Sequence, residues 1–380
     1  MKKQRLVLGA LIVCLLAGTA WLASLAAAKP AKKAAVFKVA WIYPGPHNDG
    51  GWSQAHDAGR LMVQKALGDK VQTTYKENVF SNASVPQIVA GLVRDGYNMI
   101  FATSFGMLEL GVNGQLQAKY PKVFFEQATG TQVTKNQSEY FGAAEDTIYL
   151  SGMAAGAATK KGTIGYVVPY GIPEVVRHAN AFALGAQATH PGAKVKLVWT
   201  NAWFSPPKET AAAKALVSAG SDVLGQNVDS PAAGVFAEKN GVPWVGYDSN
   251  AQKFAPKQWL TASVYNWGPY YLRRVKAAMD GTWKPGFYYG SVKDGFTGLA
   301  PFGPKVSAKT KAAIAAKKQQ ILSGKWHSFC GPIYDQAGKL KIPKGKCLDP
   351  NTKAGIGALY SMQWLVKGVI GSVSHVQPPG

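Results

Sequence analysis

The sequence predicts an α/β protein whose chain forms two doubly wound domains built on parallel sheets. Apolar runs typical of strands alternate with stretches of helical periodicity, and this alternation is typical of parallel sheets covered by helices. The pattern runs once over residues 36–142 and again over 143–264, where it restarts at Thr163–Val168. A chain of 380 residues is long enough for two such domains. No GxGxxG motif follows either first strand, which argues against a dinucleotide-dependent enzyme.

The predicted elements follow one another along the chain. Strands are expected at Lys38–Tyr43, Val71–Lys76, Met99–Ser104, Val123–Thr129, Thr163–Val168, Lys194–Asn201, Val223–Val228, Trp244–Asp248 and Leu260–Tyr265. Helices are expected at Gln54–Leu67, Val85–Asp95, Ile148–Ala158, Pro173–Thr189, Lys208–Ala219, Ala232–Asn240, Trp267–Gly281, Ala308–Leu322 and Tyr360–Val369.

The first 28 residues have the composition of a secretory signal peptide. Three basic residues precede the apolar run Leu6–Leu25, and the small residues Ala26–Ala28 predict cleavage before Lys29. The apolar run is long enough that an uncleaved membrane anchor is the alternative. Residues 29–35 form a linker without apolar periodicity. We therefore expect an exported protein, periplasmic once the signal peptide is removed.

Charge and cysteine content indicate what kind of exported protein this is. The formal net charge is +22, of which the signal segment carries three, but the lysines are scattered and no long basic stretch is interleaved with aromatic residues. A solvated basic surface is therefore expected, and no nucleic-acid partner. Two cysteines remain outside the signal segment, Cys330 and Cys347. An even count in an exported chain favours a disulfide, with two unpaired thiols as the alternative.

The first candidate ligand-binding residues lie between the first strand and the first helix. The strand ends at Tyr43, a polar loop containing Asp49 follows, and Trp52 stands just before the helix Gln54–Leu67. Such junctions are where α/β proteins place ligands. Because Asp49 would repel phosphate, the loop favours an uncharged aromatic ligand stacked on Trp52. The alternatives are a helix cap for Asp49 and a core position for Trp52.

Two further strand ends in the first half of the chain carry candidate residues. Ser104 and Phe105 end the third strand, where Ser104 would donate a hydrogen bond and Phe105 would form the second face of an aromatic sandwich. An apolar plug under the loop is the alternative for Phe105. Glu126 ends an apolar run, where a carboxylate needs a partner, so we expect it in the cleft or at the hinge.

The second half of the chain repeats this arrangement. Trp203, Asp229 and Asp248 follow the ends of three strands and are expected to point into one crevice, with a helix N-cap as the alternative for each aspartate. Asn266 and Trp267 follow the last strand of the second repeat. They are expected to line the back of the cleft, and capping with hinge packing is the alternative.

Several strings of residues carry a resemblance to a known family. They include GPHNDGGW at 45–52, FATSFG at 101–106, FEQATG at 125–130, IPEV at 172–175, DSPA at 229–232, GYDS at 246–249, NWGPYY at 266–271, FCGPI at 329–333 and MQW at 362–364. Through them the chain resembles the BMP (basic membrane protein) family of ABC-transporter substrate-binding proteins over residues 36–371. One departure is Gln127, which stands where relatives often have a histidine, and this puts a direct imidazole contact in doubt.

The resemblance implies a type I periplasmic binding protein, in which two Rossmann-like lobes joined by a three-crossover hinge close on a ligand. The crossovers would lie near 140–143, 261–264 and 290–296. Lobe one would then comprise 36–142 and 265–290, and lobe two 143–264 and 291–380. The resemblance also implies a purine nucleobase or nucleoside as ligand, with flavin or another flat heterocycle as alternatives, and delivery to an ABC permease and ATPase in the inner membrane.

The sequence offers little support for catalysis. The six histidines lack metal-ligand spacing, and neither a GxSxG motif nor a Cys/His pattern is present. We expect a monomeric solute-binding protein with no catalytic residue, metal or cofactor. The alternatives are a nucleoside-processing enzyme, which would need a carboxylate cluster, and a subunit that presents a ligand to a membrane receptor.

Overall fold

The structure is a computed structural model that describes residues 35–80, 82–109 and 115–378. The predicted signal peptide and all but the last residue of the predicted linker lie outside the described residues. Among the helices that are described, none is long and apolar enough to cross a membrane. The compact unit that contains the two sheets begins at Phe37.

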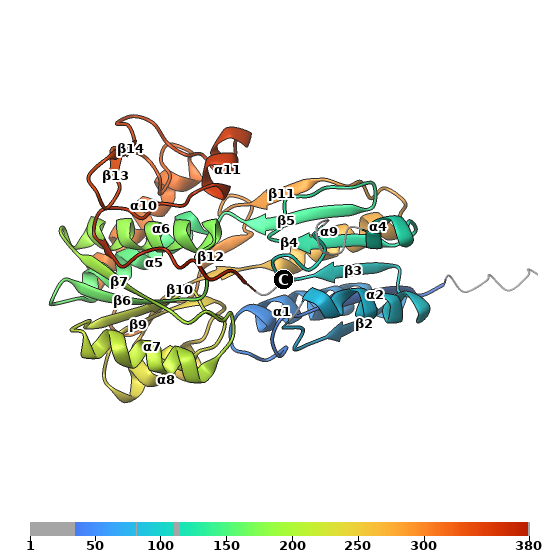
Figure 1. Ribbon diagram of the computed structural model, residues 1–380, viewed down its shortest axis with the longest axis horizontal. Coiled ribbons are helices and arrows are strands. Elements are labelled where there is room, and N and C mark those ends of the chain that lie inside the picture. Colours follow the sequence, from blue (N-terminus) through green and yellow to red (C-terminus); the bar gives the residue numbers. More distant parts are fainter. Residues whose placement is uncertain (1–34, 81, 110–114, 379–380) are drawn as a thin grey trace, which may run out of the picture. The chain divides into compact units, whose positions relative to one another are not determined.

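The first sheet, sheet A, is built mainly from the first half of the chain (Figure 1). Its strands are β1 (Phe37–Ile42), β2 (Val71–Lys76), β3 (Met99–Ala102), β4 (Phe124–Ala128), β5 (Gln137–Gly142) and β11 (Phe287–Gly290). Their order is β11-β5-β4-β3-β1-β2, and every neighbouring pair is parallel. The strand order reverses between β1 and β3, which makes this the switch point where doubly wound folds bind ligands.

The second sheet, sheet B, repeats this topology. Its strands are β6 (Thr163–Val168), β7 (Lys194–Trp199), β8 (Val223–Gln226), β9 (Trp244–Asp248), β10 (Trp259–Tyr265), β12 (Thr297–Leu299) and β15 (Val369–Ile370). The order is β12-β10-β9-β8-β6-β7-β15, and only β12 runs antiparallel to its neighbour. Its switch point lies between β6 and β8. The chain passes from sheet A to sheet B after β5, returns after β10, and crosses again after β11.

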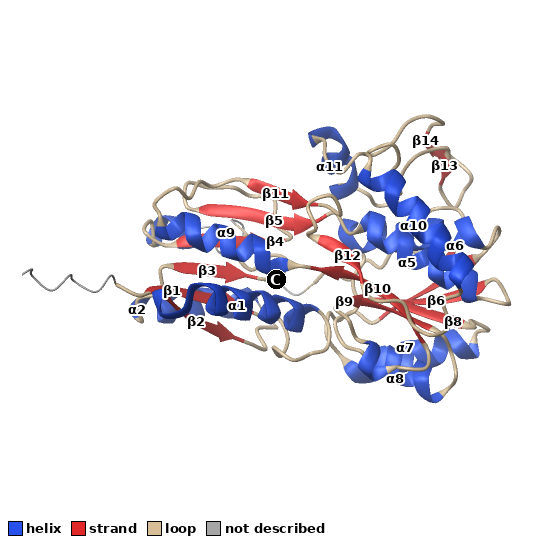
Figure 2. Ribbon diagram, turned by 180° about the vertical axis from the view of Figure 1, so that it is seen from behind, coloured by secondary structure: helices blue, strands red, loops and turns tan. Residues whose placement is uncertain are grey.

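Helices cover both faces of each sheet because the strands bury both of their faces (Figure 2). In β1, Val39 and Trp41 share a core with residues of α9, whereas Ala40 and Ile42 share another with residues of α2. Sheet A is accompanied by α1 (Trp52–Leu67), α2 (Val85–Arg94), α4 (Gln115–Lys119) and α9 (Trp267–Met279). Sheet B is accompanied by α5 (Glu145–Ala158), α6 (Pro173–Thr189), α7 (Pro206–Ser218), α8 (Ala232–Lys239) and α10 (Ala308–Leu322). Short 3-10 helices occupy Gly68–Lys70, Asn82–Ser84 and Gln252–Phe254.

The last part of the chain contains the predicted disulfide, and its final helix lies elsewhere than predicted. Cys330 and Cys347 are disulfide-bonded beside the hairpin β13 (Ile333–Tyr334) and β14 (Leu340–Ile342), as predicted. The predicted helix Tyr360–Val369 is wrong, because α11 (Lys353–Tyr360) ends where that helix was expected to begin. The Asn180 side chain accepts a hydrogen bond from Val366 N and donates one to Trp364 O, which holds the following segment in a non-helical conformation.

The prediction of an α/β fold with parallel-dominated sheets is confirmed. The strands β5, β11 and β12 were not predicted. The first half of β5 is polar, and β11 and β12 have only four and three residues, which is too short for a clear strand pattern. They become strands through pairing: β5 pairs with β4 and with β11 in sheet A, and β12 pairs with β10 in sheet B.

Candidate functional site

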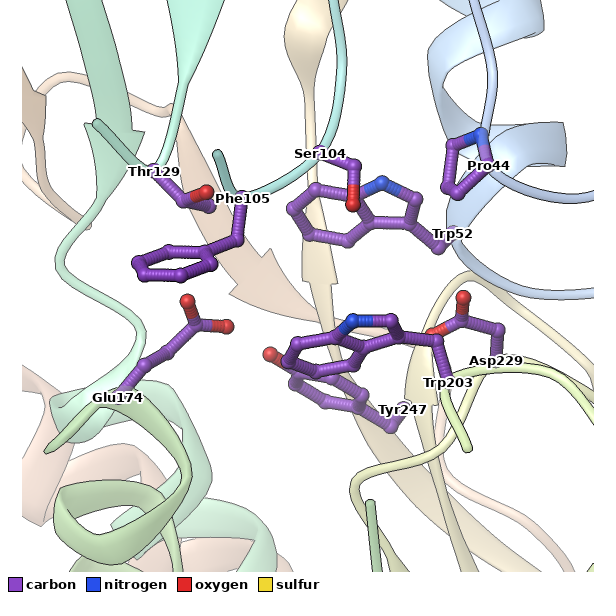
Figure 3. A pocket seen from close by; sticks show the side chains of 9 residues that line it. All are labelled: Pro44, Trp52, Ser104, Phe105, Thr129, Glu174, Trp203, Asp229 and Tyr247. Carbon is purple, nitrogen blue, oxygen red and sulfur yellow. The ribbon is translucent and has the colours of Figure 1, made fainter. Parts of the chain in front are cut away.

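A pocket lies where residues following the strands of sheet A meet residues following the strands of sheet B (Figure 3). It contains about 320 Å³ of empty space, part of it open to solvent. The lining residues are Pro44, Trp52, Ser104, Phe105, Thr129, Glu174, Trp203, Asp229 and Tyr247. They come from the segments after β1, β3, β4, β6, β7 and β8 and from the end of β9, so they surround both switch points. This is the place where doubly wound sheets bind ligands.

Aromatic rings form the upper and lower sides of this pocket in Figure 3. Trp52 lies above, Trp203 and Tyr247 lie below, and Phe105 stands at one side. Phe105 is 39% exposed, which is unusual for a phenylalanine at the end of a buried strand. Aromatic faces opposed across a narrow gap are suited to stacking on a flat ligand.

The orientation of Trp52 is fixed by its surroundings in sheet A and at the crossing between the sheets. Its indole Nε1 donates a hydrogen bond of 2.6 Å to the Thr103 carbonyl oxygen. The ring also makes edge contacts with Trp267, at 5.3 Å between centroids, and with Tyr265, at 5.7 Å. Trp52 is only 6% exposed. It is therefore a core residue that also presents a surface to the pocket.

Carboxylates supply the polar side of the site. Asp229 and Glu174 line the pocket, and Asp248 is fully buried with neither carboxylate oxygen hydrogen-bonded to any described residue. Burial raises the pKa of Asp229 well above its usual range, and the neighbouring carboxylates of Asp248 and Asp49 raise it further. Burial likewise raises the pKa of Asp248 well above the usual aspartate range and the pKa of Glu174 to about 7. These groups are suited to accept hydrogen bonds from a ligand.

Two of the lining strand ends hold strained backbone. Asp248 has φ of +67° and Thr129 has φ of +63°, in the left-handed region that side chains other than glycine rarely adopt. Asn201, which follows β7, has φ of +49°. Such strain concentrates at functional sites, where it sets the direction of a side chain.

Asp49 serves as a helix cap in this structure. Its two carboxylate oxygens accept hydrogen bonds from the backbone N–H groups of Gly51 at 2.8 Å, Ser53 at 2.8 Å and Gln54 at 3.0 Å. These donors belong to the N-terminus of α1, so the side chain satisfies groups that the helix itself leaves free. Asp49 does not line the pocket. It shapes the loop that carries Trp52.

The loop after β1 also touches the sheet B side directly. Ser249 Oγ donates a hydrogen bond of 2.6 Å to the Gly50 carbonyl oxygen. A Cβ atom on Gly51 would stand 2.0 Å from the Asp229 carbonyl oxygen, so only glycine fits there. The two sides of the site are thus in contact beside the pocket.

Three other predicted residues lie away from the pocket lining. Glu126 is fully buried and binds Arg274 Nε at 2.6 Å, Tyr270 Oη at 2.6 Å and Trp283 Nε1 at 2.7 Å, so it joins β4 to α9. Asn266 is exposed and donates to the Gly295 carbonyl oxygen at 3.4 Å.

Trp267 is 1% exposed and packs at the crossing after β10. Its ring stacks on His56 at 4.2 Å and on Tyr265 at 4.7 Å, between ring centroids. The pocket thus brings together Trp52, Ser104, Phe105, Trp203 and Asp229, while Asp248 is fully buried and does not belong to the lining.

The sequence-based prediction missed four lining residues. They are Pro44, Thr129, Glu174 and Tyr247. Glu174 could have been predicted, because Pro173 marks the start of the helix that follows β6 and Glu174 comes directly after it, at a strand-to-helix junction. Tyr247 stands beside the predicted Asp248, but strand alternation alone did not show that Tyr247 faces the pocket.

Comparisons with known proteins agree with this geometry. The sequence model of the Bmp family, described as ABC transporter substrate-binding protein PnrA-like, matches residues 36–325. The chain belongs to this family. It is 40% identical over 332 residues to a purine-binding protein of Brucella abortus, covering 87% of this chain and 92% of that protein. It is 35% identical over 296 residues to a Haloferax volcanii protein named as an ABC transporter glucose-binding protein, covering 78% and 75% of the two chains.

The fold comparison gives the same architecture. The structure of an ABC transporter solute-binding protein from Conexibacter woesei superposes with a TM-score of 0.63 at 19% identity, over 77% of this chain and 98% of that chain. This Bmp-family member is therefore an ABC transporter substrate-binding protein with the fold of the periplasmic binding proteins. Its family implies a small-molecule ligand, a membrane transporter as partner and an exported location.

Proposed function

We propose that the protein binds a purine nucleobase or nucleoside in the pocket between the two sheets. The observation that carries this proposal is the combination of Trp52 facing Trp203 and Tyr247 with the carboxylates of Asp229 and Glu174 at the edge of the gap. Opposed aromatic faces suit a flat heterocycle, and buried carboxylates suit its N–H groups or ribose hydroxyls. The 40% identity to a purine-binding protein supports the same ligand class.

We further propose that lobe one, 36–142 with 265–290, and lobe two, 143–264 with 291–380, open and close about the three crossovers. The contact of Ser249 with Gly50 would break when the lobes open and form when they close. Closure would create the surface that the permease and its ATPase recognise. The mature protein would begin at Lys29 after signal-peptide cleavage, act as a periplasmic monomer, and bind no nucleic acid.

Isothermal titration calorimetry and thermal shift with adenine, hypoxanthine, adenosine, inosine, riboflavin and glucose test the ligand. Binding to the folded state raises the melting temperature by mass action, so a purine should raise it and glucose should not. Glucose is included because of the Haloferax relative. A response to glucose with none to any purine contradicts the proposal and leaves the fold intact.

We also propose that the site performs no chemistry on its ligand. The carboxylates that line the pocket lie among aromatic rings, and none of the described lining residues is a histidine, cysteine or lysine. Incubation with inosine, followed by chromatography, should return inosine unchanged. Release of hypoxanthine by the pure protein would establish a nucleoside-processing enzyme instead.

A further inference from the structure

A second, larger cavity adjoins the ligand pocket. It contains about 610 Å³ of empty space and shares Pro44, Ser104, Phe105 and Trp203 with the inner pocket. The two spaces therefore meet along these four side chains. A ligand held in the inner pocket would present one edge to the outer cavity.

The outer cavity differs from the inner pocket in charge. Acidic side chains line the inner pocket, whereas no described residue that lines the outer cavity is acidic or basic. Phe80, Tyr170 and Phe204 join Phe105 and Trp203 on its walls. Phe80 is 55% exposed although it borders this cavity, which leaves its ring available for contact. A charged group would find no partner here, whereas an apolar or aromatic group would gain contacts on several sides.

The C-terminal segment forms one wall of the outer cavity. Because β15 pairs in parallel with β7, the chain leaves β15 toward the carboxyl ends of the strands, where the ligand pocket lies. Trp199 Nε1 donates to the Ser372 carbonyl oxygen at 2.9 Å, and Ser374 Oγ lies 3.2 Å from Asn201 Oδ1. The segment then reaches the cavity at Pro378, and Figure 1 shows its red trace passing from sheet B toward sheet A.

The C-terminal tail, residues 371–378, is held in place at this wall by direct contacts with the segments that follow strands of sheet B. A Cβ atom on Gly171 would lie 1.9 Å from the Ser374 carbonyl oxygen, so the tail packs directly on the backbone that follows β6. Gly171 belongs to the segment that leads to Glu174 of the inner pocket. The tail is thus held against the same strand ends that carry the ligand-binding side chains.

We propose that the outer cavity is a second subsite, which accepts an uncharged apolar or aromatic substituent carried by the base in the inner pocket. This inference rests on the proposed purine function and extends it. The ligand class is a substituted purine whose heterocycle stacks between Trp52 and Trp203 while its substituent contacts Phe80, Phe204 and the tail at Pro378.

The test compares adenine with adenines that carry a benzyl group at N6, N9 or C8, using isothermal titration calorimetry on the mature chain. At least one benzyl isomer should bind about fivefold to tenfold more tightly than adenine. This gain corresponds to the lower end of the binding free energy that one aromatic stacking contact contributes. Phe80→Ala should remove most of this gain and leave the adenine affinity unchanged, because Phe80 does not line the inner pocket. Phe287→Ala is the matched control, since Phe287 is 40% exposed and lies outside both cavities.

A chain ending at Val376 provides a second variant, since it lacks the Pro378 wall and keeps the tail bonds at Ser372 and Ser374. It too should lose preference for the benzyl isomer. If adenine binds while every benzyl isomer binds more weakly to the wild-type protein, the subsite is refuted and the purine function stands. If neither adenine nor any benzyl isomer binds, the purine function fails and the subsite fails with it.

Discussion

Replacing Asp229 by asparagine should weaken ligand binding and at the same time stabilise the ligand-free protein. Asp229 lines the pocket, is 4% exposed, and has no ion pair with any described residue. Burial and the nearby Asp248 raise its pKa well above the usual aspartate range. Asparagine keeps the shape and one acceptor oxygen but cannot ionise.

The stability effect depends on pH in a defined direction. The pKa of Asp229 in the folded protein exceeds its unfolded value, so the folded state holds this proton more tightly. The carboxyl therefore costs no stability below the usual aspartate pKa of about 4, and its cost grows as the pH rises toward the folded-state pKa. Asp229→Asn should match the wild-type protein near pH 4. Toward pH 8 it should be more stable, by about 1.4 kcal/mol for each pH unit by which the pH exceeds the usual aspartate pKa, up to the raised pKa of the folded state.

The binding effect has the opposite sign. A hydrogen bond between neutral groups contributes about 0.5–1.5 kcal/mol, so the variant should bind adenine or adenosine about twofold to tenfold more weakly. Thermal shift measured from pH 4 to pH 8, together with calorimetric titration at each pH, checks both effects. Unchanged affinity with an unchanged pH profile would refute the assignment of Asp229 to the ligand.

Asp248→Asn is the matched comparison, because Asp248 is buried next to Asp229 but does not line the pocket. Asparagine also tolerates the positive φ of this position. The stability gain toward pH 8 should resemble that of the Asp229 variant, whereas the loss of affinity should be smaller. Equal losses of affinity in the two variants would show that the ligand reaches Asp248 directly.

Three other predictions test the stacking, the closure and the disulfide. Trp203→Ala should weaken purine binding by about 1–3 kcal/mol in a calorimetric titration with little change in melting temperature, because Trp203 is only partly buried. Ser249→Ala removes the bond to Gly50 and should raise the ligand dissociation rate about fivefold in stopped-flow measurements; an unchanged rate contradicts a role in closure. Reduction of the bond between Cys330 and Cys347, 17 residues apart, should destabilise the protein by about 3 kcal/mol in thermal unfolding, whereas an unchanged melting temperature would show that the bond is dispensable.

The sequence was sufficient for the fold class because most of the parallel strands carry their own apolar run. Strands β1, β6 and β9 are buried along most or all of their length, so their sequences are nearly continuous apolar runs. Such runs can be recognised without knowing which strands lie beside them. Strand β11 extends sheet A by pairing with β5, which lies far from it in sequence, and pairing between distant segments leaves no local signal. The topological rule that ligands bind at the carboxyl ends of strands pointed to five residues that line the pocket, namely Trp52, Ser104, Phe105, Trp203 and Asp229.

The individual side chains were harder to predict than the region. Asp49 and Glu126 both satisfied the rule that a carboxylate near a strand end needs partners, but the protein supplies those partners itself. Asp49 finds them in the N–H groups of α1, and Glu126 finds them in Arg274 and Trp283, both distant in sequence. The outer cavity was not foreseen either, since its tail wall depends on β15 pairing with β7.

Trp52 shows why core and ligand roles need not exclude each other at this site. The sequence predicts either a ligand contact or a core position for Trp52, yet its indole Nε1 donates a hydrogen bond to the Thr103 carbonyl oxygen and the side chain also lines the pocket. Among its ring neighbours, Phe141 lies in β5 of sheet A and Tyr265 lies in β10 of sheet B. Each of these strands is followed by a crossing of the chain between the sheets. The Trp52 ring is therefore packed against the residues at which the chain crosses. A ring that packs on both strands is held in one orientation, which fixes the face that it offers to a ligand beside Trp203.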